Sequence, residues 1–227
     1  MKRMLVIVLA LACAACAPVV TKVNVPDIGK FDAVAVTDMR PATEKERKIF
    51  SLMITSKEYG IWRVGDTRLS PSPVKLLQYQ IAKQFNEEIA SPKVEVYHFV
   101  VYSNMKSQFR HGAAGAAIGG LAGALVGDAM VSREEMAKTS LVDEKAFDGM
   151  STNEYQRGLY TQAEDPNKAS VYIVYIDTAI NGKRVFTRTI APASPRKGAQ
   201  DPLVSAVQLA IKNQLTNYAH IEGNDHS

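Results

Sequence analysis

An Asn-Gly pair between two strongly β-forming runs constrains the fold of this chain more than any other feature. Residues 171–179 read VYIVYIDTA and residues 183–190 read KRVFTRTI, with Asn181 and Gly182 between them. Both central residues of the tightest hairpin turns need a positive φ, which Asn and Gly tolerate best. The sequence therefore predicts an antiparallel hairpin, and hence a fold built on a sheet.

Three further segments favour strands. Residues 94–102 read VEVYHFVVY, which is β-branched and aromatic throughout and predicts a strand covered on at least one face. Residues 31–38 predict a short apolar strand that ends before Pro41. Residues 51–55 and 60–64 could pair as a second hairpin.

Two amphipathic helices are also predicted. Ser72 is a good N-cap, and Pro73 suits the first helical position because its missing N–H has no partner there. Apolar residues then recur every fourth position through about residue 90, at Leu77, Ile81, Phe85 and Ile89. The same start recurs at Asp201-Pro202, and the stripe that follows it comprises Leu203, Val207, Ala210, Ile211, Leu215 and Tyr218.

The order of these elements predicts the fold class. Strand, helix, strand, long insertion, hairpin and helix together predict an α/β two-layer sandwich of the α+β class. We expect a small, mostly antiparallel sheet with two helices on one face, formed by residues 31–106 and 169–221. The other face would be left for solvent or a partner. Residues 107–168 are expected to form an insertion, and residues 222–227 a polar tail.

The insertion carries the most distinctive motif of the chain. Within a helix expected over residues 112–131, four glycines recur every fourth residue: Gly115, Gly119, Gly123 and Gly127. Such a row leaves a groove without side chains, through which another helix can approach closely. Each Gly costs up to about 1 kcal/mol relative to Ala in a water-exposed helix, so the row is unusual for a soluble surface. We interpret it as a glycine zipper for membrane insertion or helix packing in a homo-oligomer, with a buried soluble helix or a linker as alternatives.

The first sixteen residues indicate export. Met1-Lys2-Arg3 precedes an apolar run over residues 4–12, which is typical of a secretory signal peptide over residues 1–15. The run is shorter than the roughly 20 residues that a membrane-spanning helix needs. Cys13 and Cys16, at the end of this segment, are the only cysteines of the chain.

Ala14-Ala15-Cys16 resembles the lipobox of bacterial lipoproteins, in which small residues precede the cysteine that is acylated. Cys13 stands where Leu is usual, and Cys13 itself is the competing acylation site. The resemblance implies a lipid (palmitate) anchor on Cys16, a tether over residues 16–30 and, from Ala17, sorting to the outer membrane. Several acyl chains anchor a protein stably, at about 0.8 kcal/mol per buried methylene.

Charge and spacing argue against several functions. The formal charge is +4, Lys2 and Arg3 leave with the signal peptide, and no basic cluster typical of nucleic-acid binding remains. No motif of a nucleophile elbow, phosphate loop or cysteine nucleophile is found. None of the four histidines has a partner at metal-ligand spacing: His98, His111, His220 and His226. We therefore expect no enzymatic activity and no cofactor.

A few polar and aromatic residues have simpler interpretations. Ser72 and Lys75 match Ser-x-x-Lys, but Ser72 already serves as a helix cap. Asp38 and Arg40 could form an ion pair, which we interpret as a structural brace at the end of the first strand rather than as a catalytic pair. Trp62, the only tryptophan, could belong to the core or to a contact surface.

Residues 34–41 (VAVTDMRP) and the order of elements behind the lipobox resemble the small α/β lipoproteins of the YajG and LptE kind, over roughly 30–105 and 170–220. The zipper resembles that of the surface-exclusion lipoprotein TraT, whose Gly/Ala region is longer. The resemblance implies a non-enzymatic lipoprotein at the outer membrane, with the membrane and a second copy or an envelope protein as partners. A periplasmic binding module for a lipid, glycan or peptide is the alternative.

Overall fold

The computed structural model describes residues 20–25, 34–51, 60–85, 92–105, 137–151, 153–159, 170–193 and 200–224. Its strands are β1 Thr21–Lys22, β2 Ala35–Asp38, β3 Lys48–Ser51, β4 Ile61–Val64, β5 Leu69–Ser70, β6 Lys93–Asn104, β7 Lys138–Leu141, β8 Val171–Ile180 and β9 Lys183–Pro192. Its helices are α2 Pro73–Phe85, α4 Glu144–Gly149 and α5 Pro202–Asn224, with 3-10 turns η2 Ala42–Lys45, η3 Asp66–Arg68 and η4 Glu154–Gly158.

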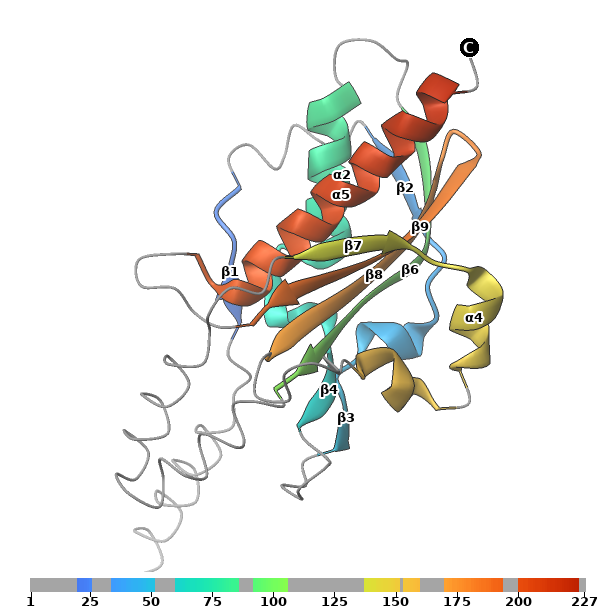
Figure 1. Cartoon of the computed structure of the whole chain (residues 1–227). Helices are drawn as coiled ribbons and strands as arrows, with labels where there is room; N and C mark the ends of the chain where they lie inside the picture. The colour runs from blue at the N-terminus through green and yellow to red at the C-terminus, as the bar shows by residue number, and fades with distance from the viewer. Residues whose placement is uncertain are drawn as a thin grey trace, which may run out of the picture.

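A seven-stranded, mostly antiparallel sheet organises the molecule (Figure 1). Its order is β3-β4-β6-β8-β9-β7, and β2 is a further strand that pairs in parallel with β6. The predicted α+β class is confirmed. The Asn-Gly hairpin is confirmed as well: β8 and β9 are joined by Asn181 at φ 52° and Gly182 at φ 84°. The second hairpin pairs as β3 with β4, although its first strand starts earlier than expected, at Lys48.

Arg40 fills a gap at one edge of β6. The parallel strand β2 pairs with residues 93–96 of β6, and the antiparallel strand β4 pairs with residues 101–104 of the same edge. Between them the Arg40 guanidinium donates to the carbonyl oxygen of Phe99 over 2.9 Å and to the carboxylates of Asp38 and Asp66. The predicted Asp38–Arg40 pair is therefore confirmed, and it takes the place that a backbone hydrogen bond would occupy.

Both predicted helices cover one face of the sheet, as expected (Figure 1). The caps are confirmed: Lys75 N donates to Ser72 Oγ over 3.4 Å, and Leu203 N donates to Asp201 Oδ1 over 2.8 Å. The apolar stripe of α5 is buried along its whole predicted length. The stripe of α2 is buried at Leu77 and Ile81, whereas its last predicted residues, 86–90, lie outside the described part of the chain.

One buried amide ties α5 to the sheet. The side chain of Gln214 is fully buried, and its Oε1 accepts from Thr187 Oγ1 over 2.5 Å. Its Nε2 donates to Thr178 Oγ1 over 2.8 Å and to the carbonyl oxygen of Val185 over 2.7 Å. A buried amide is tolerated only when its donors and acceptors are satisfied, as they are here. Gln214 thereby fixes the position of α5 along β8 and β9.

The opposite face of the sheet is not left open, and this corrects the expected insertion over residues 107–168. Strand β7 pairs with β9, and Phe147 of α4 is fully buried on this face with Tyr102, Tyr175 and Phe186. The described residues 137–151 and 153–159 therefore belong to the sandwich. They do so because the outward residues of β6 and β8 are aromatic and β-branched, and such a face requires its own cover.

Candidate functional site

The residues singled out for lipidation and helix packing lie outside the described part of the chain. These are Cys13, Cys16, Gly115, Gly119, Gly123 and Gly127. Acylation and zipper packing therefore stay predictions. What the structure does describe is where the flanking residues of these segments meet the folded domain.

The expected tether over residues 16–30 is attached to the domain in its middle. Strand β1 pairs in parallel with β5, and Val23 N donates to the carbonyl oxygen of Ser70 over 2.8 Å. The Val23 side chain is only 6% exposed and belongs to the core under the helices. The chain is thus fixed from residue 21, because Val23 gains a buried apolar site. Of the expected tether, residues 16–19 and 26–30 lie outside the described part of the chain.

The attachment points of the N-terminal segment and of the glycine-rich segment lie at one end of the sheet. The last residue of β6, the first of β8 and the last of β9 are Cα partners in one row. These three strand termini therefore lie at the same end of the sheet. Strand β7 begins opposite Ile190, two residues before the end of β9. Strand β1 lies at the same end, where Thr21 Oγ1 donates to Asp201 Oδ2 beside the start of α5 (Figure 1).

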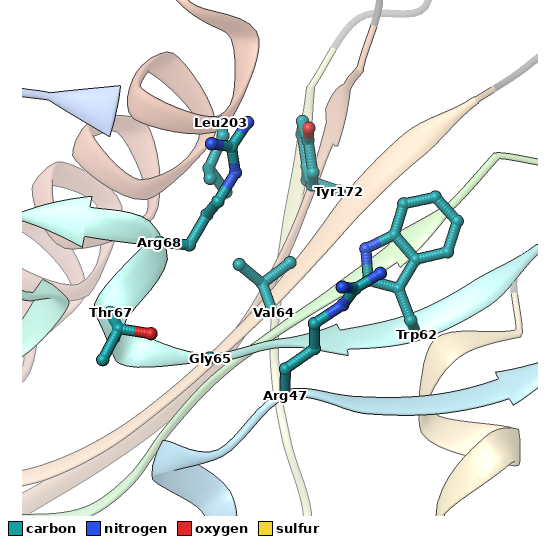
Figure 2. A pocket seen from close by; sticks show the side chains of 8 residues that line it. All are labelled: Arg47, Trp62, Val64, Gly65, Thr67, Arg68, Tyr172 and Leu203. Carbon is teal, nitrogen blue, oxygen red and sulfur yellow. The ribbon is translucent and has the colours of Figure 1, made fainter. Parts of the chain in front are cut away.

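A pocket of ≈ 320 Å³ opens at this end, on the face that the helices cover (Figure 2). Trp62, Ser103 and Tyr172 are Cα partners in the row next to the end of the sheet, and their strands bring Trp62 and Tyr172 to the same pocket. Val64 lies near the centre of the lining in Figure 2, and Leu203 from the first turn of α5 completes its apolar part.

The charged residues of the lining are cationic. Arg47 and Arg68 both contribute to it, and none of the eight described lining residues is acidic. In Figure 2 Arg47 and Trp62 lie on one side of Val64, and Arg68 lies on the other side with Leu203. Two guanidinium groups beside an indole and a phenol offer many hydrogen-bond donors and little acceptor capacity. The pocket is therefore suited to an anion that also carries apolar atoms.

Gly65 allows Arg47 to reach this pocket. A Cβ atom on Gly65 would lie 2.8 Å from the backbone nitrogen of Arg47, too close for any other residue without a backbone shift. The chain before β3 can therefore pass directly against the turn that follows β4. This contact places the exposed Arg47 side chain over the edge of the pocket rather than away from it.

Tyr172 remains a neutral hydroxyl at physiological pH. Burial and the nearby charge of Asp201 raise its pKa to about 12, against the opposing charge of Arg68. A neutral phenol can donate a hydrogen bond to an anion, whereas a phenolate would repel it. The lining thus combines the neutral Tyr172 hydroxyl with the two charged donors Arg47 and Arg68.

A second polar cluster lies on the opposite face, under α4. The side chain of Glu44 is 6% exposed, and its Oε1 lies 2.7 Å from Nδ1 of His98. The ring of His98 packs against those of Phe147 and Phe186, with centroids at 4.7 and 5.8 Å, and the guanidinium of Arg157 stacks on Phe147 at 3.6 Å. These groups contact one another and adjoining backbone. We interpret them as a brace that holds η2 and η4 on the sheet.

Glu154 extends this brace. Its carboxylate accepts from Lys48, Arg63 and Tyr102. Burial opposes its ionisation, but the hydrogen bond from Lys48 and the charge of Arg63 outweigh burial and lower its pKa. The carboxylate is thus held ionised, surrounded by donors from three strands. Its role is to join η4 to the sheet.

The described residues hold no group of three or more His, Cys, Asp or Glu side chains placed to bind a metal ion. None of the helices in the described ranges has both the length and the apolar character that crossing a bilayer requires. His98 and His220 fall within these ranges, whereas His111 and His226 do not.

Comparison with protein-family models, with curated proteins and with solved structures gives no match for this chain. The likeness to the lipoproteins of the YajG and LptE kind, and to TraT, therefore stays an expectation from the sequence.

Sequence patterns alone do not identify the pocket. Trp62 was ambiguous between core and contact surface, and the structure places it half-buried in the lining. Arg47, Arg68 and Tyr172 carry no motif. Tyr172 meets Trp62 through the register of β4, β6 and β8, and Arg47 reaches the pocket through the close approach at Gly65. The single local signal is Gly65 at the end of a strand, a position where a close backbone approach is common.

Proposed function

We propose that this chain is a non-enzymatic lipoprotein of the outer membrane, anchored through Cys16, whose α+β domain holds its glycine-rich segment against the membrane or against another copy. The observation that carries the proposal is the shared end of the sheet. Strand β1, which follows the anchor, and the attachment points on either side of residues 106–136 all lie there. An anchor and a zipper that act together at one membrane need this arrangement.

The same geometry narrows the mode of action. A segment whose two ends belong to one domain crosses a membrane an even number of times or not at all. Two helical crossings need about 40 residues, which is more than residues 106–136 contain. The proposal is therefore that the zipper packs against another helix or lies in the membrane interface. A periplasmic binding module is the second candidate function, and the pocket beside Trp62 favours it.

Acylation at Cys16 is tested by substitution. In Cys16→Ala the incorporation of a fatty-acid analogue should fall to background, and the protein should move from the membrane fraction to the precursor or soluble fraction. Cys13→Ala is the matched control and should be processed nearly as the unchanged chain. Label that persists in Cys16→Ala would assign the anchor to Cys13.

Zipper packing is tested by adding bulk to the glycine row. In the double variant Gly119→Leu/Gly123→Leu, cross-linking between copies in native membranes should fall severalfold, because the side chains occupy the groove where backbones meet. Leu favours helix more than Gly does, so lost helicity would not explain the result. Ala116→Leu/Ala124→Leu lies off the row and should retain cross-linking.

An unchanged cross-linked product in the glycine double variant would contradict packing through the groove. Interfacial insertion would then be the better account. In that case the bulkier apolar residues should increase membrane retention of the Cys16→Ala chain, which is the opposite direction from the packing result.

A further inference from the structure

The pocket beside Trp62 has the chemistry of a phosphate site. Its two guanidinium groups come from different segments, Arg47 before β3 and Arg68 at the end of η3. A carboxylate has two oxygens, which one arginine fork already occupies. The phosphodiester of a phospholipid has two non-bridging and two ester oxygens on a tetrahedral centre, so it can accept from two arginines and from the neutral Tyr172 hydroxyl in different directions. The donor set therefore matches a phosphate better than a carboxylate.

The rest of the lining matches the part of a lipid that lies next to its phosphate. Val64 and Leu203 are apolar, and Trp62 and Tyr172 are the residue types enriched where membrane meets water. The volume of ≈ 320 Å³ is at the lower limit of small-molecule sites, which span roughly 300–1,000 Å³. It can hold a headgroup with its glycerol, and the acyl chains would leave the pocket along its apolar lining.

The position of the pocket brings it within reach of a membrane. Strand β1 begins at Thr21, and the five residues from Cys16 can span at most about 18 Å when fully extended. Strand β1 pairs with β5, which follows Arg68 directly in the chain. An anchor at Cys16 would therefore keep the pocket close to the headgroups of the leaflet that holds it.

We infer that this pocket binds the phosphate headgroup of an anionic phospholipid, with Arg47 and Arg68 on the phosphate and Trp62 and Tyr172 beside the glycerol. The inference that a lipid supplies the phosphate rests on the proposed anchoring at Cys16. Recognition of the phosphate itself does not, since it depends only on the pocket.

Fluorescence of Trp62, the only tryptophan, reports occupancy directly. The full chain, purified in a neutral detergent, is titrated with dihexanoyl phosphatidylglycerol, with dihexanoyl phosphatidylcholine and with sn-glycerol 1-phosphate. Phosphatidylglycerol should shift the emission saturably, and phosphatidylcholine should bind about tenfold more weakly because its headgroup carries a cation. Glycerol phosphate should bind more weakly than phosphatidylglycerol, because it lacks the chains that adjoin the apolar lining.

Substitution separates the pocket from non-specific attraction. Arg47→Gln should raise the Kd for phosphatidylglycerol about tenfold or more, the loss expected for charge-assisted hydrogen bonds. Arg47 is exposed, so the variant should fold as the unchanged chain does. Lys212→Gln removes the same charge from an exposed site on α5 outside the pocket and should leave the Kd within about twofold.

Three results would overturn the inference: no emission shift with any of the phosphates, equal affinity for the two lipids, or an unchanged Kd in Arg47→Gln. Glycerol phosphate that binds as tightly as phosphatidylglycerol would uphold phosphate recognition and overturn the lipid as its source. Failure of acylation at Cys16 would appear in the labelling experiment and leave the titration unaffected, so the two proposals fail separately.

Discussion

Replacing residues 137–159 with a Gly/Ser linker of equal length should abolish the cooperative unfolding transition. These residues supply β7, which pairs with β9, and α4, whose Phe147 is fully buried against Tyr175 and Phe186 with centroids at 5.2 and 4.9 Å. Loss of a buried Phe side chain alone costs about 3–5 kcal/mol. The whole free energy of unfolding of a domain is about 5–15 kcal/mol. Thermal unfolding followed by circular dichroism measures the result.

The physical reason is the aromatic face that the linker would expose. Tyr102, Tyr175 and Phe186 would lose their cover, and Glu154 would no longer accept from Arg63 and Tyr102. A buried arginine without its carboxylate is strongly destabilising. Apolar exposure and lost charge pairing therefore act in the same direction, and a linker of equal length excludes chain closure as the cause.

The matched control replaces residues 108–134 with a Gly/Ser linker of equal length. We predict that the glycine-rich segment leaves the domain, so this variant should retain a cooperative melt close to that of the unchanged chain. Loss of the transition in both variants would place the glycine-rich segment in the core as well. Retention in both would show that the described contacts of β7, α4 and η4 are dispensable.

Arg40→Ala should lower the free energy of unfolding by about 3–5 kcal/mol at neutral pH, the cost of removing one partner of a buried ion pair. The Arg40 side chain is 1% exposed and lies between Asp38 and Asp66, with N···O distances of 2.9 and 2.7 Å. Its loss removes the hydrogen bonds that Arg40 donates to both carboxylates and to the carbonyl oxygen of Phe99. Urea unfolding at pH 7 measures the difference.

Lys45→Ala is the control, because Lys45 contacts the same Asp38 carboxylate from a more exposed position, at 39% exposure. Exposed pairs of this kind contribute about 0–1 kcal/mol. A loss of that small size in Arg40→Ala would contradict the role of Arg40 as the buried link between β2 and β6.

Arg40 should also contribute to the dependence of the free energy of unfolding on acid pH. Burial opposes ionisation of Asp38, but hydrogen bonds from Arg40 and Lys45 and the charge of Arg40 outweigh it and lower the pKa from 3.8 to about 2. A depressed carboxyl pKa stabilises the folded state above the unfolded value and loses this contribution as pH falls through the folded value. The stability of the unchanged chain should therefore decline between about pH 4 and pH 2. Arg40→Ala should show less of this decline, and urea unfolding at pH 7, 4 and 3 would check it.

Local sequence determined those elements that depend on short-range physics. Ser72 and Asp201 start the two helices because their side chains accept hydrogen bonds that the first turn cannot satisfy. Asn181 and Gly182 turn the hairpin because both tolerate positive φ. The buried stripe of α5 and the long strands follow from hydrophobic periodicity. These elements were sufficient to predict a mostly antiparallel sheet with two helices on one face.

Only the tertiary structure decided what covers the second face and where a pocket forms. Strand β7 is short and mostly polar, and α4 has only six residues, so neither carries a periodic signal of its own. Both are ordered by Phe147 and by pairing with β9, contacts between residues about 40 to 50 positions apart.

The pocket has the same origin. Trp62 and Tyr172 are brought to one row by the register of three strands, and Arg47 arrives because Gly65 lets two backbones touch. The physical reason is that propensity, capping and turn chemistry act within a few residues, whereas burial of a shared face acts between residues that the sequence keeps far apart.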